Sequence, residues 1–179
     1  MKNLFLMLLA ASLFVSCGDK VSSKERQQSS VEVEDNQSNY ALDVYNFEGF
    51  ESFLSRKDDK TYVINFWATW CAPCIKELPY FEIVNKKYSG NNVEVILVSL
   101  DFPKQYEKKL IPFIEKKKLE SKVIALDDPK MNDWIPKIDE DWSGAIPATI
   151  IYNKDKSQFY ERSFNLEELE NELKQFITL

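Results

Sequence analysis

Apolar residues along the chain form two kinds of pattern. Some lie in short runs of strand length, and others recur every three or four positions, as on one face of a helix. Because the two kinds of segment alternate, we expect an α/β domain built on a central sheet. The predicted strands span residues 62–67, 93–100, 122–126, 148–152 and 158–162. The polar stretch 153–157 predicts an antiparallel hairpin between the last two.

Three helices are predicted among these strands. The first starts near Cys71, the second near Tyr106, and the last opens with Asn165 and Glu168 at the spacing of a capping box. Asp128 and Pro129 predict the start of a further short helix, with Asp128 as its cap. The apolar positions expected on the buried faces of the three helices are Cys74, Leu78, Phe81, Val84 and Tyr88, then Tyr106, Leu110, Phe113 and Ile114, then Leu166, Leu169, Leu173 and Phe176.

The N-terminus is typical of an export signal. Lys2 carries a positive charge, and the apolar run at 4–15 is too short to cross a bilayer. The segment that follows is rich in Ser, Gln, Glu and Lys and has too few apolar side chains to fold alone. We therefore expect a signal peptide at 1–16, a flexible tether at 17–39 and a folded domain at 40–179.

Composition excludes several kinds of chemistry. The chain has 29 acidic and 23 basic residues and no basic stripe, so a nucleic-acid partner is not expected. It contains no histidine, which excludes Ser-His and Cys-His nucleophile pairs and imidazole metal ligands.

Cys71 and Cys74 form a CxxC motif at the predicted helix start. Backbone N–H groups and the helix dipole favour a thiolate there, so Cys71 is predicted to attack a disulfide and Cys74 to resolve the mixed disulfide. A zinc site would need four ligands, and only two are in sight. A purely structural disulfide would close a very short loop and stabilise little. The sequence thus favours redox chemistry, with no metal and no cofactor.

The stretch FWATWCAPCIKELP, residues 66–79, resembles the TlpA/ResA branch of the thioredoxin superfamily. The resemblance covers about residues 41–179. It implies a thioredoxin-like fold, in which a central mixed sheet is flanked by helices and a strand and a helix are inserted before the final hairpin. Residues 122–137 would be that insert. It also implies a membrane-anchored extracytoplasmic thiol-disulfide oxidoreductase.

The resemblance implies roles for residues around the two cysteines. Pro147 would be a cis-proline beside the sulfurs, and the backbone of Ile146 would pair with an extended substrate segment. Trp70 would lie beside Cys71 at the rim of the site, whereas a packing role is expected for Trp67. Trp134 and Trp142 precede the proline loop, where they could shape a substrate groove or simply pack.

Glu77 is the predicted proton acceptor. Asn65 stands where thioredoxin itself has a buried aspartate, and asparagine cannot take a proton. Glu77 lies three residues after Cys74, on nearly the same helical face, and matches the glutamate typical of the branch. We therefore expect it to accept the Cys74 proton, through water if necessary.

The residues FVSC at 14–17 resemble a bacterial lipobox, although Phe14 departs from the usual leucine. The resemblance implies that Cys17 is lipidated, so that the protein is a lipoprotein on the periplasmic or cell-surface side of a membrane. The alternative is a plain signal peptide or a buried free Cys17.

The dipeptide Ala72-Pro73 bears on the direction of electron flow, because the two residues between the cysteines tune thiolate stability. Without a histidine there, the sequence favours a reductant of protein disulfides, for example in cytochrome c maturation, that a membrane electron donor recharges. The alternatives are a disulfide oxidase or isomerase and a non-catalytic thioredoxin-like binding lipoprotein. A peroxidase is less favoured, because no PxxxTxxC pattern precedes either cysteine.

Overall fold

The computed structural model describes residues 40–177. The predicted signal peptide, the predicted lipidation residue Cys17 and the predicted tether lie outside the described residues.

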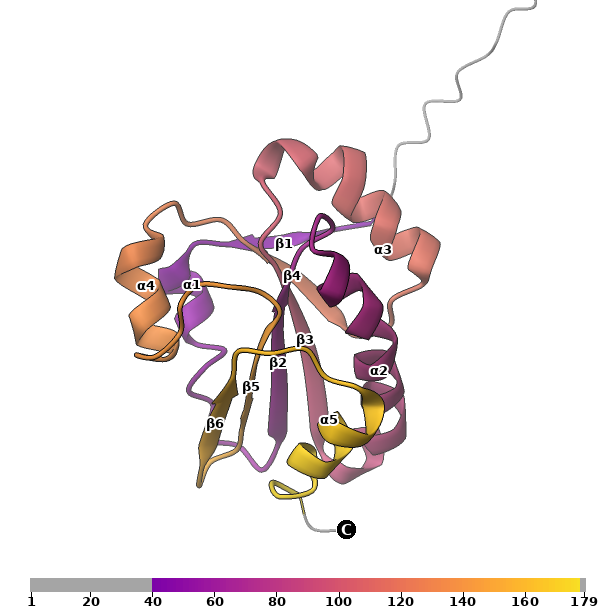
Figure 1. Cartoon of the computed structure of the whole chain (residues 1–179), viewed down its shortest axis with the longest axis vertical. Helices are drawn as coiled ribbons and strands as arrows, with labels where there is room; N and C mark the ends of the chain where they lie inside the picture. The colour runs from indigo at the N-terminus through magenta and orange to yellow at the C-terminus, as the bar shows by residue number, and fades with distance from the viewer. Residues whose placement is uncertain (1–39, 178–179) are drawn as a thin grey trace, which may run out of the picture. The chain divides into compact units, whose positions relative to one another are not determined.

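A six-stranded mixed sheet forms the centre of the domain, in the order β1-β4-β3-β2-β5-β6 (Figure 1). The first four strands in this order are parallel to one another, whereas β5 and β6 run antiparallel to their neighbours. The strands are β1 (Asp43–Tyr45), β2 (Thr61–Trp67), β3 (Val93–Ser99), β4 (Lys122–Leu126), β5 (Ala148–Tyr152) and β6 (Ser157–Tyr160).

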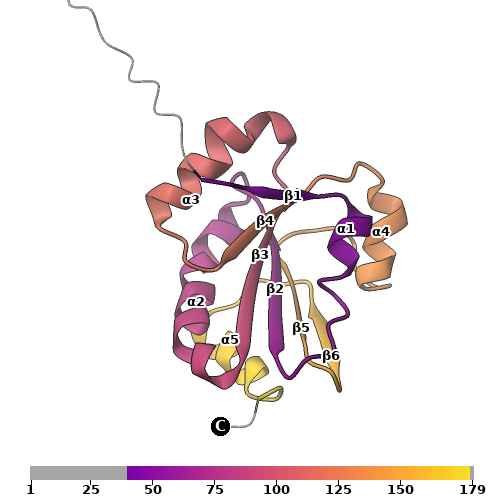
Figure 2. The same ribbon diagram turned by 180° about the vertical axis from the view of Figure 1, so that it is seen from behind.

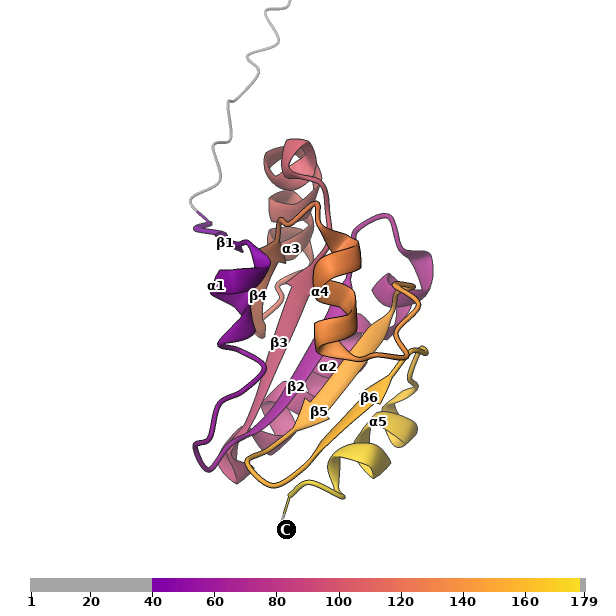
Figure 3. The ribbon, with the colours of Figure 1, turned by 90° about the vertical axis from the view of Figure 1, so that its left-hand side faces the viewer.

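Helices cover both faces of this sheet. Helices α2, α3 and α5 pack on one face and α1 and α4 on the other, as the reverse and side views show (Figures 2 and 3). Each face has its own apolar core, so the sheet is buried on both sides, as in other α/β domains. The helices are α1 (Phe47–Glu51), α2 (Ala72–Tyr88), α3 (Ile111–Lys117), α4 (Met131–Ile138) and α5 (Leu166–Leu173), with 3₁₀ turns at Ser89–Asn91 and Pro103–Gln105 and a π turn at Tyr106–Leu110.

Strand β2 is buried along its whole length because β3 and β5 pair with its two edges and helices cover both of its faces. Its side chains alternate between the two cores. Val63 and Trp67 pack with α2, whereas Ile64 and Phe66 pack with α1 and α4. Asn65 shares the α2 side of the strand with Val63 and Trp67, which places a buried amide under the start of α2.

The inserted strand and helix are present as β4 and α4. β4 lies between β1 and β3 and is parallel to both, so that Ile124 is paired with Asp43 on one side and with Val98 on the other. α4 lies on the same face of the sheet as α1. Its Trp134 ring stacks on Phe47 of α1, with the ring centroids 6.0 Å apart. The insert is therefore an integral part of the sheet, and the predicted thioredoxin-like architecture is confirmed.

The five predicted strands, the hairpin and the capping box are all found in the structure. Asn165 accepts a hydrogen bond from the Glu168 N–H at 3.0 Å, and Glu168 accepts one from the Asn165 N–H at 2.9 Å. The sequence did not predict β1 or α1. β1 has only three residues, which are largely exposed, so it lacks the apolar alternation by which a strand is recognised.

The prediction that Asp128 caps a helix beginning at Pro129 is wrong. α4 begins at Met131, and Lys130 occupies its N-cap position. The Asp128 carboxylate instead accepts hydrogen bonds from the Phe47 N–H at 3.1 Å and the Lys130 N–H at 2.9 Å. The Asp128 side chain, which local spacing predicted to cap α4, therefore makes a tertiary contact with the start of α1 instead.

Prolines inside helices have two different outcomes. α2 continues through Pro79, whereas Pro112 is in the first turn of α3, separated by Ile111 from a wide π turn at Tyr106–Leu110. Proline lacks an amide hydrogen and its ring clashes with the carbonyl four residues earlier, which accounts for a widened turn there. Tyr106, Leu110 and Ile114 are nevertheless all buried, as their spacing predicted.

Candidate redox site

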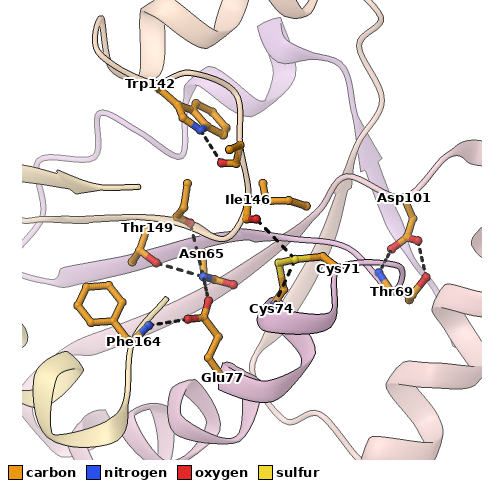
Figure 4. Close-up of a disulfide and its surroundings, with 12 residues drawn as sticks. Asn65, Thr69, Cys71, Cys74, Glu77, Asp101, Trp142, Ile146, Thr149 and Phe164 are labelled. Carbon is orange, nitrogen blue, oxygen red and sulfur yellow. Dashed lines mark hydrogen bonds between the residues drawn. A yellow bond between two sulfur atoms is a disulfide. The ribbon is translucent and has the colours of Figure 1, made fainter. Parts of the chain in front are cut away.

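Cys71 and Cys74 form a disulfide at the N-terminus of α2, with their Cα atoms 5.3 Å apart (Figure 4). Cys71 is the N-cap residue, and its sulfur accepts a hydrogen bond from the Cys74 N–H at 3.3 Å. Cys71 is 5% exposed and Cys74 is fully buried. The sulfur that faces the N–H groups of the helix is therefore the outer one, which is the arrangement that stabilises a thiolate on Cys71 after reduction.

The proline loop before β5 packs against this disulfide. The Ile146–Pro147 peptide bond is cis, as the family resemblance implied, and the Ile146 carbonyl oxygen lies 3.7 Å from the Cys71 sulfur. Trp142 supports the loop by donating its indole N–H to the Ala145 carbonyl at 2.9 Å, and its ring packs on Phe66 at 4.9 Å. Trp142 thus supports the proline loop by packing and by a hydrogen bond to its backbone.

The loop between β2 and α2 is anchored by Asp101, a residue that sequence reasoning missed. The buried Asp101 carboxylate accepts hydrogen bonds from the Thr69 N–H at 2.9 Å and from the Thr69 hydroxyl at 2.5 Å. The Ser99 hydroxyl donates to the same carboxylate at 2.9 Å. The sequence did contain a signal for this residue. Asp101 follows the predicted strand 93–100, and polar residues at the carboxyl ends of parallel strands often form sites.

Glu77 is buried beside the disulfide, with only 1% of its surface exposed. One carboxylate oxygen accepts a hydrogen bond from the Asn65 side-chain amide at 3.0 Å, and the other accepts one from the Phe164 N–H at 2.8 Å. The Asn65 amide also donates to the Thr149 hydroxyl at 3.1 Å, which fixes its orientation. These bonds join α2 to β2, β5 and the segment before α5 (Figure 4).

Burial raises the pKa of Glu77 to about 7, because a charged carboxylate is poorly solvated there. The hydrogen bonds from Phe164 and Asn65, and the positive charge of Arg162, act in the opposite direction and lower it. Glu77 also lines a hollow of about 350 Å³ with Pro73, Tyr80 and Ser163, so a proton on it has a short route to solvent. Its pKa suits a group that exchanges protons near neutral pH.

The other predicted site residues take different places. Trp70 lies directly before Cys71 and is 53% exposed, at the rim of the site, whereas Trp67 is fully buried and packs on Phe113 at 5.5 Å. Trp134 is buried and donates its indole N–H to the Asp128 carbonyl at 3.0 Å. Pro73 is exposed on the first turn of α2. Cys17 lies outside the described residues.

Within residues 40–177, no group of three or more His, Cys, Asp or Glu side chains is arranged to hold a metal ion. No helix in the same part of the chain is both long enough and apolar enough to cross a membrane.

Fold and site together define a thioredoxin-like protein whose CxxC disulfide is at the N-terminus of a helix and opposite a cis-proline. The chain belongs to the AhpC/TSA family, which it matches over residues 33–157.

Thiol-disulfide oxidoreductases are prominent among the relatives. The chain is 37% identical over 81 residues to the thiol-disulfide oxidoreductase ResA of Bacillus cereus, and 46% identical over 48 residues to that of Oceanobacillus iheyensis. The first match covers 41% of this chain and 47% of the relative, so the chain spans about half the length of that relative. The second covers 27% of this chain and 25% of the relative.

Two solved structures have a similar fold. One is a thiol:disulfide interchange protein of the thioredoxin family from Chlorobium tepidum, with a TM-score of 0.56 at 19% identity over 70% of this chain and 83% of the other. The second is a putative thiol-disulfide oxidoreductase from Bacteroides vulgatus, with a TM-score of 0.52 at 27% identity over 69% of this chain and 81% of the other.

The raised pKa of Glu77 predicts a pH-dependent stability. Between the unfolded value of 4.5 and the folded value of about 7, the folded state binds more protons, so the free energy of unfolding falls as pH rises through this window. The total change is about 3 kcal/mol for this pKa difference. Glu77→Gln removes the ionisation, so the oxidised variant should gain stability relative to wild type by about that amount between pH 4.5 and 7.

Urea unfolding of the oxidised proteins across this pH range measures the difference. The exposed Glu167→Gln is the matched control and should follow the wild-type curve. Parallel curves for wild type and Glu77→Gln would contradict the prediction.

Proposed function

We propose that this protein is an extracytoplasmic thiol-disulfide oxidoreductase that reduces disulfides in protein substrates. The observation that carries the proposal is the Cys71–Cys74 disulfide at the N-terminus of α2, with the outer sulfur against the cis-proline loop. The names of the ResA relatives support the same activity.

The reaction has two exchange steps. In the reduced protein, the Cys71 thiolate attacks one sulfur of a substrate disulfide, forms a mixed disulfide and releases the other substrate sulfur as a thiolate. The Cys74 thiol then loses its proton, and its thiolate attacks the Cys71 sulfur. This step forms the Cys71–Cys74 disulfide and releases the second substrate thiol. The substrate gains two electrons, and the protein must regain two from an electron donor.

Glu77 is the proposed acceptor of the Cys74 proton. It is on the same helix three residues later, it is buried with Cys74, and its pKa of about 7 leaves much of it able to take a proton at neutral pH. The hollow that it lines with Pro73 gives the proton a way to solvent.

The proposed substrate contacts are on the outer side of the site. Trp70 and Pro73 flank Cys71, and the backbone of Ile146 would pair with an extended substrate segment beside Pro147. Oxidised apocytochromes c are one protein substrate of the kind the resemblance implies.

The direction of electron flow is proposed from the motif itself. Ala72-Pro73 places no charged or imidazole group between the cysteines, so only the helix N-terminus stabilises the thiolate. Less stabilisation of the reduced form favours a reductant.

The proposed location follows from the N-terminal sequence. Residues 1–16 would be removed as a signal peptide, Cys17 would carry the lipid, and residues 17–39 would tether the domain at 40–179 to the membrane. A membrane electron donor would then recharge the dithiol.

The reduction potential tests the direction of electron flow. The full chain carrying Cys17→Ser has only Cys71 and Cys74 left to be oxidised or reduced. It is equilibrated in thiol-disulfide buffers, and tryptophan fluorescence measures the fraction reduced. A potential near or below about −250 mV is expected for a reductant, whereas about −200 to −120 mV would indicate an oxidase or isomerase. Absence of any reversible couple would leave a binding lipoprotein as the function.

Glu77→Gln tests the proton acceptor. In wild type, the single-turnover rate of peptide-disulfide reduction should rise as pH increases through about 7, where Glu77 loses its proton. The variant should lack this titration and be slower at neutral pH by roughly 10²-fold, the lower range for general acid-base catalysis. Glu167→Gln again serves as control. An unchanged pH profile in Glu77→Gln would rule out this role.

Cys17→Ser tests the anchor. Cells that express the wild-type chain should incorporate labelled fatty acid into the protein and retain it in the membrane fraction, and the variant should lose both properties. Cys71→Ser should keep the label, because that cysteine is in the folded domain. Equal labelling of wild type and Cys17→Ser would exclude lipidation at this residue.

A further inference from the structure

A groove of about 320 Å³ begins beside the disulfide and continues away from it. Trp70 and Ile146 line its end nearest the cysteines, and the Ile146 carbonyl oxygen is the atom that lies 3.7 Å from the Cys71 sulfur. The loop after β3 contributes Phe102, and the segment from β4 to α4 contributes Asp127 and Met131. We call this surface, formed by Trp70, Phe102, Asp127, Met131 and Ile146, the acidic groove.

The acidic groove exposes large apolar side chains. Phe102 is 63% exposed, Trp70 is 53% exposed and Met131 is 43% exposed. These three are most of the five large apolar residues that the described part of the chain exposes. A concentration of exposed apolar side chains in a concave surface is typical of an interaction site.

The charges of the groove have one sign. Asp101, Asp127 and Asp128 line it, and none of the described lining residues is a lysine or an arginine. Asp101 is buried and bonded to Thr69 and Ser99, and Asp128 accepts two backbone N–H groups. The Asp127 carboxylate is exposed and has no hydrogen bond or ion pair with another described residue, so it can meet a charge on a ligand.

We propose that the acidic groove selects substrate segments in which a large apolar side chain and a lysine or arginine lie within a few residues of the disulfide cysteine. The apolar side chain would contact Phe102 and Met131, and the cationic group would approach Asp127. Positive charge on the substrate matches the carboxylates of the groove, and complementary charge raises both specificity and association rate. This inference rests on the proposed function, since it names the substrate class of the same site.

Three peptides that differ in one residue test the proposal. Each contains one cysteine and one nearby tryptophan, with lysine, glutamine or glutamate beside the tryptophan, and each is a mixed disulfide with thionitrobenzoate. The full chain carrying Cys17→Ser and Cys74→Ser is used in reduced form. Its Cys71 thiolate attacks the peptide sulfur, forms a stable mixed disulfide and releases coloured thionitrobenzoate, so absorbance gives the second-order rate constant.

The lysine peptide should react faster than the glutamine peptide by about two- to fivefold, as for an exposed ion pair, and the glutamate peptide should be slowest. Salt at about 1 M should remove most of this difference. Asp127→Asn should reduce the lysine-to-glutamine ratio towards one. Phe102→Ala should slow all three peptides by about fivefold, as for truncation of an interface aromatic residue. Because both side chains are exposed, these variants should fold normally.

Two controls separate the groove from general effects. Asp155→Asn removes an exposed charge at the β5–β6 turn, and Ile83→Ala truncates an exposed apolar residue on α2 that does not line the groove. Neither should change any of the rates. Equal rates for the three peptides, or an unchanged ratio in Asp127→Asn, would overturn the proposal.

A small neutral disulfide, dithiodipyridine, distinguishes failure of the groove from failure of the proposed function. Every groove variant should react with it at the wild-type rate, because it has no segment to occupy the groove. If Cys71 reacts with dithiodipyridine but shows no preference among the peptides, only the groove proposal fails. If Cys71 does not react with dithiodipyridine, both proposals fail together.

Discussion

The position of the Cys71 sulfur depends on the parallel pairing of β2 with β3. In this register Trp67 is opposite Ser99, so the loops that follow the two strands start side by side. Asp101 on one loop can therefore bind both the backbone and the hydroxyl of Thr69 on the other. This anchor fixes the chain just before Cys71, the N-cap residue of α2. The placement of the sulfur against the helix N–H groups depends on this sheet register.

Glu77 is a buried carboxylate next to the helix start that carries the disulfide. A buried carboxylate is tolerated only with good hydrogen-bond partners, and here they come from β2 and from the segment before α5. The same bonds tie two distant parts of the chain to the helix that carries the disulfide. Burial raises the pKa of the Glu77 carboxyl to about 7, so this carboxyl can exchange protons at neutral pH. Glu77 therefore affects both the stability of the fold and the proposed chemistry.

The inserted strand and helix extend this site without altering the disulfide itself. β4 lies inside the sheet, and its carboxyl end leads into the segment that carries Asp127 and Met131. The cis-proline loop, supported by Trp142, forms the neighbouring wall. The proposed exchange chemistry belongs to the cysteines and their helix, whereas the insert supplies part of the lining of the proposed substrate groove.

The sequence by itself determined the features that are encoded in local spacing. The CxxC pair, the five longer strands, the hairpin and the capping box of the last helix all depend on residues within a few positions of one another, and the structure has each of them. The family resemblance added the cis-proline and the position of the insert. Cys71, Cys74, Glu77 and Pro147 could be named in this way.

Only the tertiary structure decided the partners of these residues. Asp101 meets Thr69, and Glu77 meets Asn65 and the Phe164 N–H, across separations of 12 to 87 residues. Asp128, which local spacing assigned to a helix cap, binds the start of α1 instead. A strand as short as β1 forms because β4 offers it an edge, not because of its own pattern. Such contacts depend on sheet register and helix packing, which no local stretch of sequence specifies, because the competing local and distant partners differ little in chemistry.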